Sequence, residues 1–433
     1  MNKIEKLLHT LAPKGVEFRK LGEVIDILKG KQLNKELLLD YGKYPVMNGG
    51  IYASGYWNEY NTDYPKIIIS QGGASAGYVN YMTSKFWAGA HCYTIELNLE
   101  KLNYKFLYYF LKNSQTILMK SQFGAGIPAL NKADIETLTI PIPPLEIQQE
   151  IVTILDAFTE LNTELNTELN TELNARKKQY QYYQNMLLDF NDINQSHKDA
   201  KERLAQKPYP KRLKTLLHTL APKGVGFRKL GDIGEYIRGV TYKKNQEINN
   251  LECGIKVLRA NNITLSNHLN FEDIKVINKN VKIRKEQYLK KNDILICAGS
   301  GSSEHIGKVA FIDTDFDYVF GGFMGVIRIR EVNSRFVYHI FTSNIFKQYL
   351  EKSLNTTTIN NLNANILQNF LIPIPPLEIQ QEIVKILDAF TELNTELNAE
   401  LNAELNARKK QYEYYREKLL TFKPLTPNKE VKK

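Results

Sequence analysis

Apolar residues recur at helical spacing in a long segment that follows two consecutive prolines, Pro143 and Pro144. They stand three or four positions apart, at Ile147, Ile151, Ile154 and Phe158. Proline is well tolerated in the first turn of a helix, where its missing N–H costs nothing. No proline or glycine interrupts the chain before Phe190. The pattern predicts one continuous amphipathic helix.

Within this helix the tetrapeptide Thr-Glu-Leu-Asn occurs four times, from Thr159 to Asn174. Its leucines have a period of four, whereas a helix turns every 3.6 residues, so the stripe drifts by about 40° per repeat. The stripe consists of Leu161, Leu165, Leu169 and Leu173. A drifting apolar stripe favours a partner helix that wraps around it. The alternative interpretation is a solvated helical linker.

The helical segment is duplicated almost unchanged. Residues 140–190 return as residues 372–422, with 43 of 51 positions identical. The second copy carries the same stripe at Leu393, Leu397, Leu401 and Leu405. It also repeats the tyrosines that follow the stripe, with Tyr180, Tyr182 and Tyr183 returning as Tyr412, Tyr414 and Tyr415. We therefore expect the two copies to pair antiparallel about a pseudo-twofold axis and to bury both stripes.

A second duplication sets the domain order. Residues 7–22 return as residues 216–231 with one difference, whereas the sequences between the duplicated segments are unlike. The predicted domains are an N-terminal conserved segment (1–20), a first variable domain (21–140), a central conserved helical region (141–229), a second variable domain (230–372) and a C-terminal conserved helical region (373–433).

Both variable blocks read as mixed α/β domains, with short strands, glycine-bearing loops and one longer helix. In the first block we expect strands at 66–70 and 91–97 and a helix at 104–118. In the second we expect strands at 293–298, 308–313 and 325–330 and a helix at 336–350. The similar order predicts a common fold with divergent loops, and the fold class α/β (mixed α+β) for the chain.

Composition narrows the function classes. No apolar run is long enough to span a membrane and the N-terminus has no apolar signal region, so we expect a cytoplasmic protein without a membrane partner. The three cysteines form no CxxC pair, which argues against a zinc site or a disulfide framework. A net charge of +10 favours a polyanionic partner. Residues 21–140 hold 11 Lys, no Arg and 10 acidic residues, so the first block is near neutral and its affinity needs help from elsewhere.

Catalytic motifs are scarce. The glycines near residue 301 lack Walker A spacing, and both Pro-Pro pairs precede leucine instead of the aromatic residue of an amino-base methyltransferase motif. His9 and His218 have no nearby cysteine or acid that would complete a triad or a metal site. Scattered acidic residues leave a nuclease site open. We expect no catalytic residue and no bound metal.

The loops of the variable blocks carry amides, cations and hydroxyls between glycines, which suit nucleic-acid contacts. The candidates in the first block are Lys29, Lys31, Gln32, Asn48, Tyr52, Tyr56, Ser70, Gln71, Ser75 and Gln122. Those in the second are Arg238, Lys243, Lys244, Arg259, Asn261, Asn262, Ser300, Ser302, Ser303, Lys308, Thr356, Thr357, Thr358 and Asn360. Each loop alone is also compatible with an ordinary surface turn.

Taken together, these segments carry a family resemblance. The two unlike blocks each end in IPIPPLEIQQEIV followed by ILDAF, and tetrapeptide repeats precede ARKKQY. The blocks contain YPVMNGGIYASGYW, IIISQGGASAGYV, FWAGAHCYTI, KNDILICAGSGSSEHIGKVAFI and FGGFMGVIRI. The chain resembles the specificity (S) subunit of type I restriction-modification systems over essentially its whole length.

The resemblance implies two target recognition domains that each read one half of a bipartite, asymmetric site in double-stranded DNA. It also implies two conserved helical regions that set the gap and dock two methyltransferase (M) subunits, together with restriction (R) subunits. S-adenosylmethionine, ATP and Mg would then be bound by those partners, and this chain would bind no cofactor. The alternative function is a helical scaffold that binds proteins instead of DNA, and an autonomous methyltransferase or nuclease comes third.

Exposed positions of the duplicated helices are candidates for subunit docking or phosphate contact. They are Gln148, Gln149, Arg176, Lys177 and Lys178, with their counterparts Gln380, Gln381, Arg408, Lys409 and Lys410. For the basic run, favourable placement of cations near the C-terminal half of a helix is an equal alternative. Each tetrapeptide adds about 6 Å of helix, so repeat number should change the distance between the half-sites.

Overall fold

The computed structural model describes residues 3–123, 128–190, 208–248, 253–299, 305–354 and 362–424. The chain divides into two compact units. Unit 1 comprises Met1–Asn170 and Leu401–Lys433, and unit 2 comprises Thr171–Glu400. The first variable block therefore lies in unit 1 and the second in unit 2.

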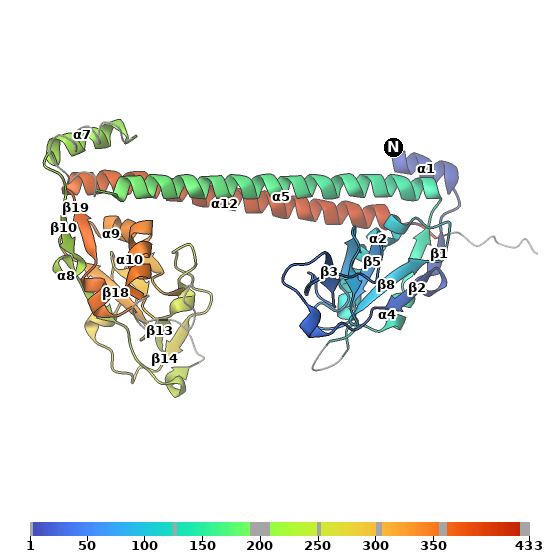
Figure 1. Cartoon of the computed structure of the whole chain (residues 1–433), viewed down its shortest axis with the longest axis horizontal. Coiled ribbons are helices and arrows are strands. Elements are labelled where there is room, and N and C mark those ends of the chain that lie inside the picture. Colours follow the sequence, from blue (N-terminus) through green and yellow to red (C-terminus); the bar gives the residue numbers. More distant parts are fainter. Residues whose placement is uncertain are drawn as a thin grey trace, which may run out of the picture. The chain divides into compact units, whose positions relative to one another are not determined.

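Two helices of 44 residues each, α5 (Leu145–Leu188) and α12 (Leu377–Leu420), confirm the predicted long helices (Figure 1). Each begins directly after its Pro-Pro pair. The carbonyl of Pro144 accepts the amide of Gln148 at 3.1 Å, and the carbonyl of Pro376 accepts the amide of Gln380 at 3.2 Å. The prolines thus mark the helix start without losing a backbone hydrogen bond.

The two helices run antiparallel within each unit. In unit 1 the ring of Phe158, near the start of α5, stacks on Tyr415, near the end of α12, with centroids 5.5 Å apart. In unit 2 Tyr183 stacks on Phe390 at 5.3 Å. Phe390 is the duplicate of Phe158 and Tyr415 is the duplicate of Tyr183. The same contact is therefore made twice with the roles of the helices exchanged, as a pseudo-twofold repeat requires.

The leucine stripes are less buried than the sequence led us to expect. Leu161 is 62% exposed and Leu393 is 53% exposed. The other six leucines of the stripes are partly exposed. The period of four rotates each successive leucine around the helix, so a single neighbouring helix does not cover the whole stripe.

Unit 1 holds a four-stranded antiparallel sheet and a smaller three-stranded sheet, with helices packed beside them. The first sheet has the order β2 (Ile25–Lys29), β8 (Cys92–Leu97), β5 (Lys66–Ser70), β6 (Val79–Met82). The second has the order β4 (Gly55–Trp57), β3 (Tyr44–Met47), β7 (Trp87–Ala88). The helices are α1 (Lys3–Leu11), α2 (Tyr104–Asn113), α3 (Gln115–Lys120) and α4 (Lys132–Glu136), with short 3-10 turns η1 (Leu21–Glu23) and η2 (Lys35–Leu37).

Unit 2 repeats this plan. Its first sheet has the order β11 (Gly234–Arg238), β18 (Met324–Ile329), β15 (Ile294–Cys297), β16 (Val309–Phe311). Its second has the order β12 (Glu247–Ile248), β14 (Lys275–Ile277), β13 (Ile255–Leu258), β17 (Tyr318–Phe320). The helices are α7 (Lys211–Leu220), α8 (Leu230–Ile233), α9 (Ser334–Phe341), α10 (Asn344–Leu354) and α11 (Ala364–Gln368), with 3-10 turns η4 (Lys244–Gln246), η5 (Ala260–Asn262) and η6 (Lys285–Gln287).

The common fold of the variable blocks is confirmed by the sheet topology. Strand order and direction in the four-stranded sheet of unit 1 match those in the first sheet of unit 2. In the second sheets, β3 pairs with β7 in parallel, as β13 pairs with β17. β4 pairs antiparallel with β3, as β14 pairs with β13. Unit 2 has an additional edge strand, β12, beside β14, where unit 1 has an isolated bridge between Leu39 and Tyr56 of β4.

Short two-stranded ribbons attach the variable blocks to the duplicated segments. β1 (Glu17–Lys20) pairs with β9 (Thr139–Ile142), and β10 (Gly226–Lys229) pairs with β19 (Leu371–Ile374) in the same register. Beyond each ribbon, three apolar residues of the long helix are fully buried in the core of its unit. They are Ile147, Ile151 and Leu155 in α5, and Ile379, Ile383 and Leu387 in α12.

One sequence prediction needs correction in both blocks. The helices expected at 104–118 and 336–350 are each interrupted, which gives α2 and α3 in unit 1 and α9 and α10 in unit 2. In unit 2 the hydroxyl of Ser343 accepts the amide of Ile345 at 3.2 Å and donates to the carbonyl of Ile340 at 2.7 Å. This side chain satisfies backbone groups at the junction and so ends one helix while starting the next.

Candidate nucleic-acid interface

In unit 1 the candidate loops meet at one edge of the four-stranded sheet. The end of β2, the end of β5 and the start of β8 lie together, because Lys29 pairs with Tyr93 and Ser70 pairs with Cys92. The loop after β3 joins them, since Asn48 Oδ1 accepts the amide of His91 at 3.2 Å. Segments far apart in the sequence therefore form one surface.

The side chains at this edge divide into two groups. Lys29, Lys31, Gln32, Tyr52 and Tyr56 are exposed, and Tyr52 is 82% exposed. These five side chains are accessible to a ligand, and their contact with nucleic acid stays a prediction.

The other predicted residues of unit 1 are less accessible, and three of them, Asn48, Ser70 and Gln122, bind the backbone of neighbouring loops. Ser70 is buried and donates its hydroxyl to the carbonyl of Gly49, so it does not face outward as we expected. Gln122 donates to the carbonyl of Ala76 at 2.6 Å. Asn48, Gln71 and Ser75 are half-buried. Polar residues of glycine-rich loops are needed here to satisfy buried backbone groups.

A close approach of two loops requires glycine at the same place in both units. A Cβ on Gly30 would lie 2.1 Å from the carbonyl oxygen of Gly89, and a Cβ on Gly239 would lie 2.0 Å from that of Gly321. Any side chain there would force the loops apart. Each glycine follows a basic residue, Lys29 or Arg238, which therefore occupies the same position at the sheet edge.

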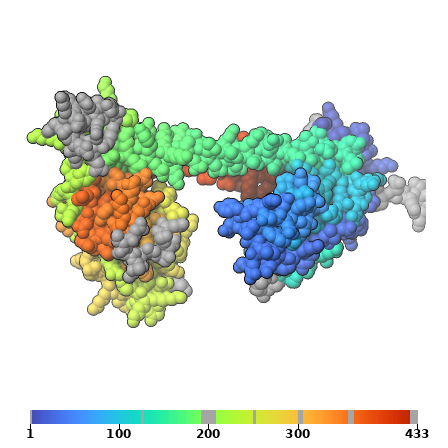
Figure 2. Space-filling model, viewed as in Figure 1, coloured from blue at the N-terminus to red at the C-terminus, as the bar shows by residue number. Residues whose placement is uncertain are grey.

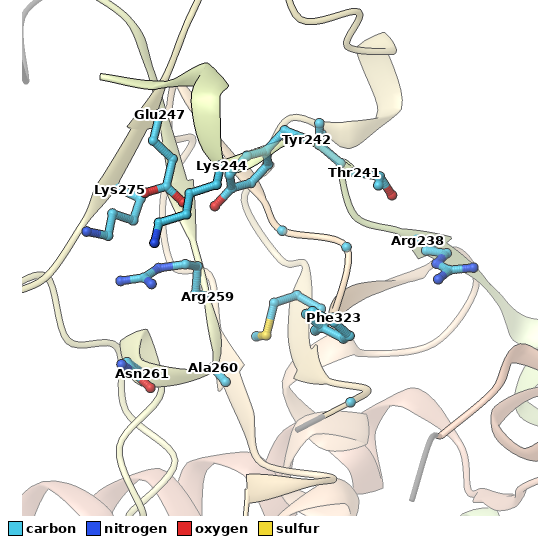
Figure 3. A pocket seen from close by; sticks show the side chains of 15 residues that line it. Arg238, Thr241, Tyr242, Lys244, Glu247, Arg259, Ala260, Asn261, Lys275 and Phe323 are labelled. Carbon is cyan, nitrogen blue, oxygen red and sulfur yellow. The ribbon is translucent and has the colours of Figure 1, made fainter. Parts of the chain in front are cut away.

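Unit 2 has a pocket of about 940 Å³ at the equivalent edge (Figure 3). Its charged lining consists of four cations, Arg238, Lys244, Arg259 and Lys275, and one carboxylate, Glu247. The lining also includes Tyr242, Phe323, Asn261 and three glycines, Gly299, Gly321 and Gly322. Figure 3 shows Lys244, Lys275 and Arg259 on one side of the pocket and Arg238 on the other. Arg259 pairs with Asp273, and the remaining three cations against one anion favour a negatively charged ligand.

One side chain of the pocket, Arg259, is held in place, and another, Tyr242, is kept neutral. Arg259 Nη2 lies 2.7 Å from Asp273 Oδ2, and Asn262 Oδ1 accepts the amide of Arg259 at 2.8 Å. Burial raises the pKa of Tyr242, and the neighbouring Glu247 raises it further, so the phenol remains a hydrogen-bond donor at neutral pH. A fixed guanidinium and a neutral phenol are suited to phosphate or base contacts.

Two predicted contacts of unit 2 are wrong. Lys308 is buried and donates to the carbonyls of Ile263 at 2.6 Å and Ala260 at 3.3 Å. Burial lowers the pKa of Lys308, and its ammonium supports the loop after β13 instead of facing solvent. Asn262 is also buried and donates to the carbonyl of Asn270 at 2.8 Å.

Five of the remaining predicted residues of unit 2 are exposed or half-buried, and the other seven lie outside the described part of the chain. Arg238, Lys243, Lys244 and Asn261 are exposed, and Arg259 is half-buried. Ser300, Ser302, Ser303, Thr356, Thr357, Thr358 and Asn360 lie outside the described residues.

Sequence reasoning missed one exposed position that recurs in both units. Phe323, 72% exposed, accepts the amide of Ala298 with its carbonyl, and His91 accepts the amide of Gln71 in the same way. Each stands two residues after the glycine whose carbonyl makes the close approach. Alignment of FWAGAH with YVFGGF would have identified the pair.

The docking candidates on the long helices also divide. Gln148 and Gln380 are buried, with 0% and 3% exposure, so the expectation that they lie on an exposed face is wrong. The other eight candidates are exposed: Gln149, Arg176, Lys177, Lys178, Gln381, Arg408, Lys409 and Lys410. Arg176 pairs with Glu172 at 2.7 Å, and Arg408 pairs with Glu404 at 2.8 Å.

Exposed apolar residues accompany these positions at duplicated sites. Leu145 and Leu377 are 46% and 50% exposed, and Tyr182 and Tyr414 are 58% and 59% exposed. Figure 2 shows side chains of α5 at the surface.

Among the described helices, none is long and apolar enough to cross a membrane.

Comparisons with known proteins give a consistent result. The model of the "Type I restriction modification DNA specificity domain" matches residues 13–175 and 222–407. A Haemophilus influenzae protein named as a type I restriction enzyme specificity subunit is 32% identical over 434 residues, which cover 97% of this chain and 98% of that protein. The Escherichia coli EcoR124I/EcoR124II specificity subunit is 28% identical over 447 residues, with 98% of both chains covered.

A solved structure shares the fold. One chain from a structural study of complex assembly and conformational transition of the type I R-M system has a TM-score of 0.65 to this chain. It is 17% identical, and the superposition covers 95% of this chain and 98% of that one.

Proposed function

Because the chain belongs to the type I restriction-modification DNA specificity family, we propose that each unit reads one half of a bipartite, asymmetric site in double-stranded DNA. The edge of the four-stranded sheet is the reading surface in unit 1, and the cationic pocket is the reading surface in unit 2. The pocket carries the proposal, since its four cations and fixed Arg259 suit a duplex that presents phosphates and base edges.

The two surfaces differ where their positions correspond, which explains why the two half-sites would be unlike. Lys29 of unit 1 stands where Arg238 stands in unit 2, and His91 stands where Phe323 stands. Unit 1 offers exposed tyrosines and lysines at its edge, whereas unit 2 offers a strongly cationic pocket. Unit 2 would therefore supply more of the salt-dependent affinity.

The spacer would be set by the tetrapeptide repeats. Each repeat adds about 6 Å to a continuous helix, and base pairs are spaced about 3.4 Å apart. Removing or adding one repeat would accordingly shift the preferred gap by about two base pairs.

We further propose that the duplicated exposed residues dock two methyltransferase subunits, one on each unit, and that restriction subunits join this complex. Gln149 with Leu145, and Gln381 with Leu377, form matched surfaces on the first turns of α5 and α12. In this proposal the chain itself is non-catalytic. Its partners supply S-adenosylmethionine-dependent methylation and the ATP- and Mg-dependent activity.

The test is the affinity of the complex with methyltransferase subunits for duplexes that carry one intact half-site. Arg259→Gln should weaken binding to the half-site of unit 2 by about 1–3 kcal/mol and relax its sequence preference, because a bidentate arginine contact contributes about that much. Binding to the half-site of unit 1 should be unchanged. Equal loss on random DNA would show that Arg259 contacts phosphate only, and no loss on any duplex would refute the assigned surface.

A further inference from the structure

Each variable block is fastened to its long helix by the same buried glutamine. In unit 1, Gln148 Oε1 accepts the amide of Asn103 at 2.7 Å. In unit 2, Gln380 Oε1 accepts the amide of Asn333 at 3.0 Å. The two glutamine amides donate to Pro143 at 2.6 Å and to Pro375 at 2.7 Å.

The two asparagines cap the helices that follow them, α2 and α9. The side-chain oxygen of Asn103 accepts two amides at the start of α2, at 2.9 and 3.1 Å, and that of Asn333 accepts the equivalent pair at the start of α9 at the same distances. Capping fixes the start of the helix while the glutamine fixes the cap. The first turn of each domain helix is thereby tied to the long helix.

About two turns farther along the long helix, an aspartate that is also duplicated pairs with a cation and accepts a hydrogen bond from a second side chain. In unit 1, Asp156 pairs with Lys105 Nζ at 2.8 Å and accepts the hydroxyl of Tyr109. Lys105 and Tyr109 stand four residues apart, so they share one face of α2.

Unit 2 makes the same arrangement with different residues. Arg335 Nε lies 3.0 and 3.2 Å from the two oxygens of Asp388, and His339 Nε2 lies 2.8 Å from Asp388 Oδ1. Asp388 is the duplicate of Asp156. An arginine thus replaces the lysine, and an imidazole replaces the phenol, on an unchanged acceptor.

The residues involved form a short pattern in blocks that are otherwise unlike. Residues 103–109 read NYKFLYY and residues 333–339 read NSRFVYH. The common pattern is Asn, any residue, Lys or Arg, Phe, an apolar residue, Tyr, and then Tyr or His. Its phenylalanine, Phe106 or Phe336, is fully buried beside the contacts.

We infer that Gln148 with Asp156, and Gln380 with Asp388, are positioning residues that form a common seat for the recognition domains. The segments 103–109 and 333–339 of the recognition domains contact this seat. The seat holds the domain helix at two points about 12 Å apart along the long helix, since eight residues separate each glutamine from its aspartate. Two-point attachment fixes the direction in which the reading surface faces, and hence which spacer the chain accepts.

The opposite helix adds a contact that is not common to both units. Gln184 donates to the carbonyl of His339 at 3.1 Å and to Thr342 Oγ1 at 2.8 Å in unit 2. Its duplicate, Arg416, donates to Asn113 Oδ1 at 3.1 Å in unit 1. Positions 184 and 416 are among the few that differ between the copies. The seat is therefore shared, and this additional contact is matched to each domain.

The inference rests on the proposed function only through its DNA readout. We would compare the complete chain, in complex with methyltransferase subunits, with its Asp388→Ala variant. The measured quantity is the ratio of methylation rates on duplexes with the native spacer and with a spacer one base pair longer. We expect this ratio to fall about tenfold, which corresponds to the removal of one charge-assisted hydrogen bond.

Two further variants separate positioning from simple folding. Arg335→Lys combined with His339→Tyr gives unit 2 the residues that contact the aspartate in unit 1, and this variant should retain most of the spacer ratio. Glu136→Ala removes a carboxylate of α4 that pairs with Lys132 of the same helix at 3.4 Å, away from the seat and from the repeats, and should leave the ratio unchanged. An unchanged ratio in Asp388→Ala, or an equal fall in Glu136→Ala, would overturn the inference.

A second measurement does not depend on DNA. In urea unfolding of the purified chain, Asp388→Ala and Arg335→Ala should each lower the midpoint of unit 2, and the double variant should fall no further than the worse single variant. Additive shifts would refute the seat. If the two substitutions were non-additive but the wild-type chain methylated no bipartite site, the seat would stand and the proposed function would fail.

Discussion

Replacement of Gln148 by alanine should destabilise unit 1 far more than replacement of its neighbour Gln149. Gln148 has 0% exposure and takes part in three hydrogen bonds. It accepts from the amide of Asn103 at 2.7 Å and donates to the carbonyls of Lys101 at 2.9 Å and Pro143 at 2.6 Å. Gln149 is exposed and accepts one bond from the side chain of Asn103 at 3.2 Å.

The magnitude follows from the groups left without partners. In Gln148→Ala, one backbone donor and two backbone acceptors lose their bonds; the bond to Pro143 is buried and the other two are part-buried. An unsatisfied buried donor costs about 1–3 kcal/mol, and carbonyls with a second lone pair cost less, so we expect a loss of about 2–4 kcal/mol. For Gln149→Ala we expect a loss below about 1 kcal/mol.

The assay is urea unfolding of the complete chain, followed by hydrogen exchange and mass spectrometry of peptides from each unit. Protection should fall in α2 and the first turns of α5 for Gln148→Ala, with the peptides of unit 2 unchanged. Equal destabilisation by the two variants, or a loss below about 1 kcal/mol for Gln148→Ala, would refute the reasoning.

Three other predictions follow from the described contacts. Burial lowers the pKa of His339 below its ordinary value of 6.5, so the folded chain favours the neutral ring. The stability that this contributes is complete above pH 6.5 and is lost as the pH falls below it, whereas Tyr109 gives unit 1 no such dependence. Denaturation midpoints of the wild-type and His339→Gln chains from pH 7 to pH 5 will check this. Arg238→Gln and Lys275→Gln should each reduce the slope of log affinity against log salt by about one for every phosphate that the cation neutralises, measured by fluorescence anisotropy, and an unchanged slope would exclude phosphate binding by that side chain. Deletion of one tetrapeptide from residues 159–174 should leave both half-sites intact and shift the methylated gap by about two base pairs, and an unchanged gap would sink the ruler model.

The long helices could be predicted from the sequence because their pattern is local and is present twice. Pro144 marks a helix start, no glycine or proline follows before Pro208, and the duplicate carries the same apolar positions. The variable blocks are not duplicated, so only individual strands were predictable there from short apolar runs, and β5 lies where the run of residues 66–70 predicts it.

Side-chain burial could not be predicted where it depends on contacts distant in sequence. Gln148 and Gln149 are chemically identical neighbours, and only the docking of α2 makes one buried and the other exposed. Lys308 stands in a polar, glycine-rich segment, yet the carbonyl of Ile263, 45 residues away, accepts its ammonium. The partners of Asp156 lie about fifty residues upstream, so the seat appears only when the fold brings them together.

The most direct test of DNA recognition by this chain is a map of N6-methyladenine in a methylation-free host that expresses it with its methyltransferase subunit. We predict a bipartite motif of two unlike halves with a fixed gap, and in an Arg259→Gln variant a change confined to one half. No chain-dependent methylation, with the two proteins shown to be folded and bound to each other, would contradict DNA recognition and favour a protein-binding scaffold.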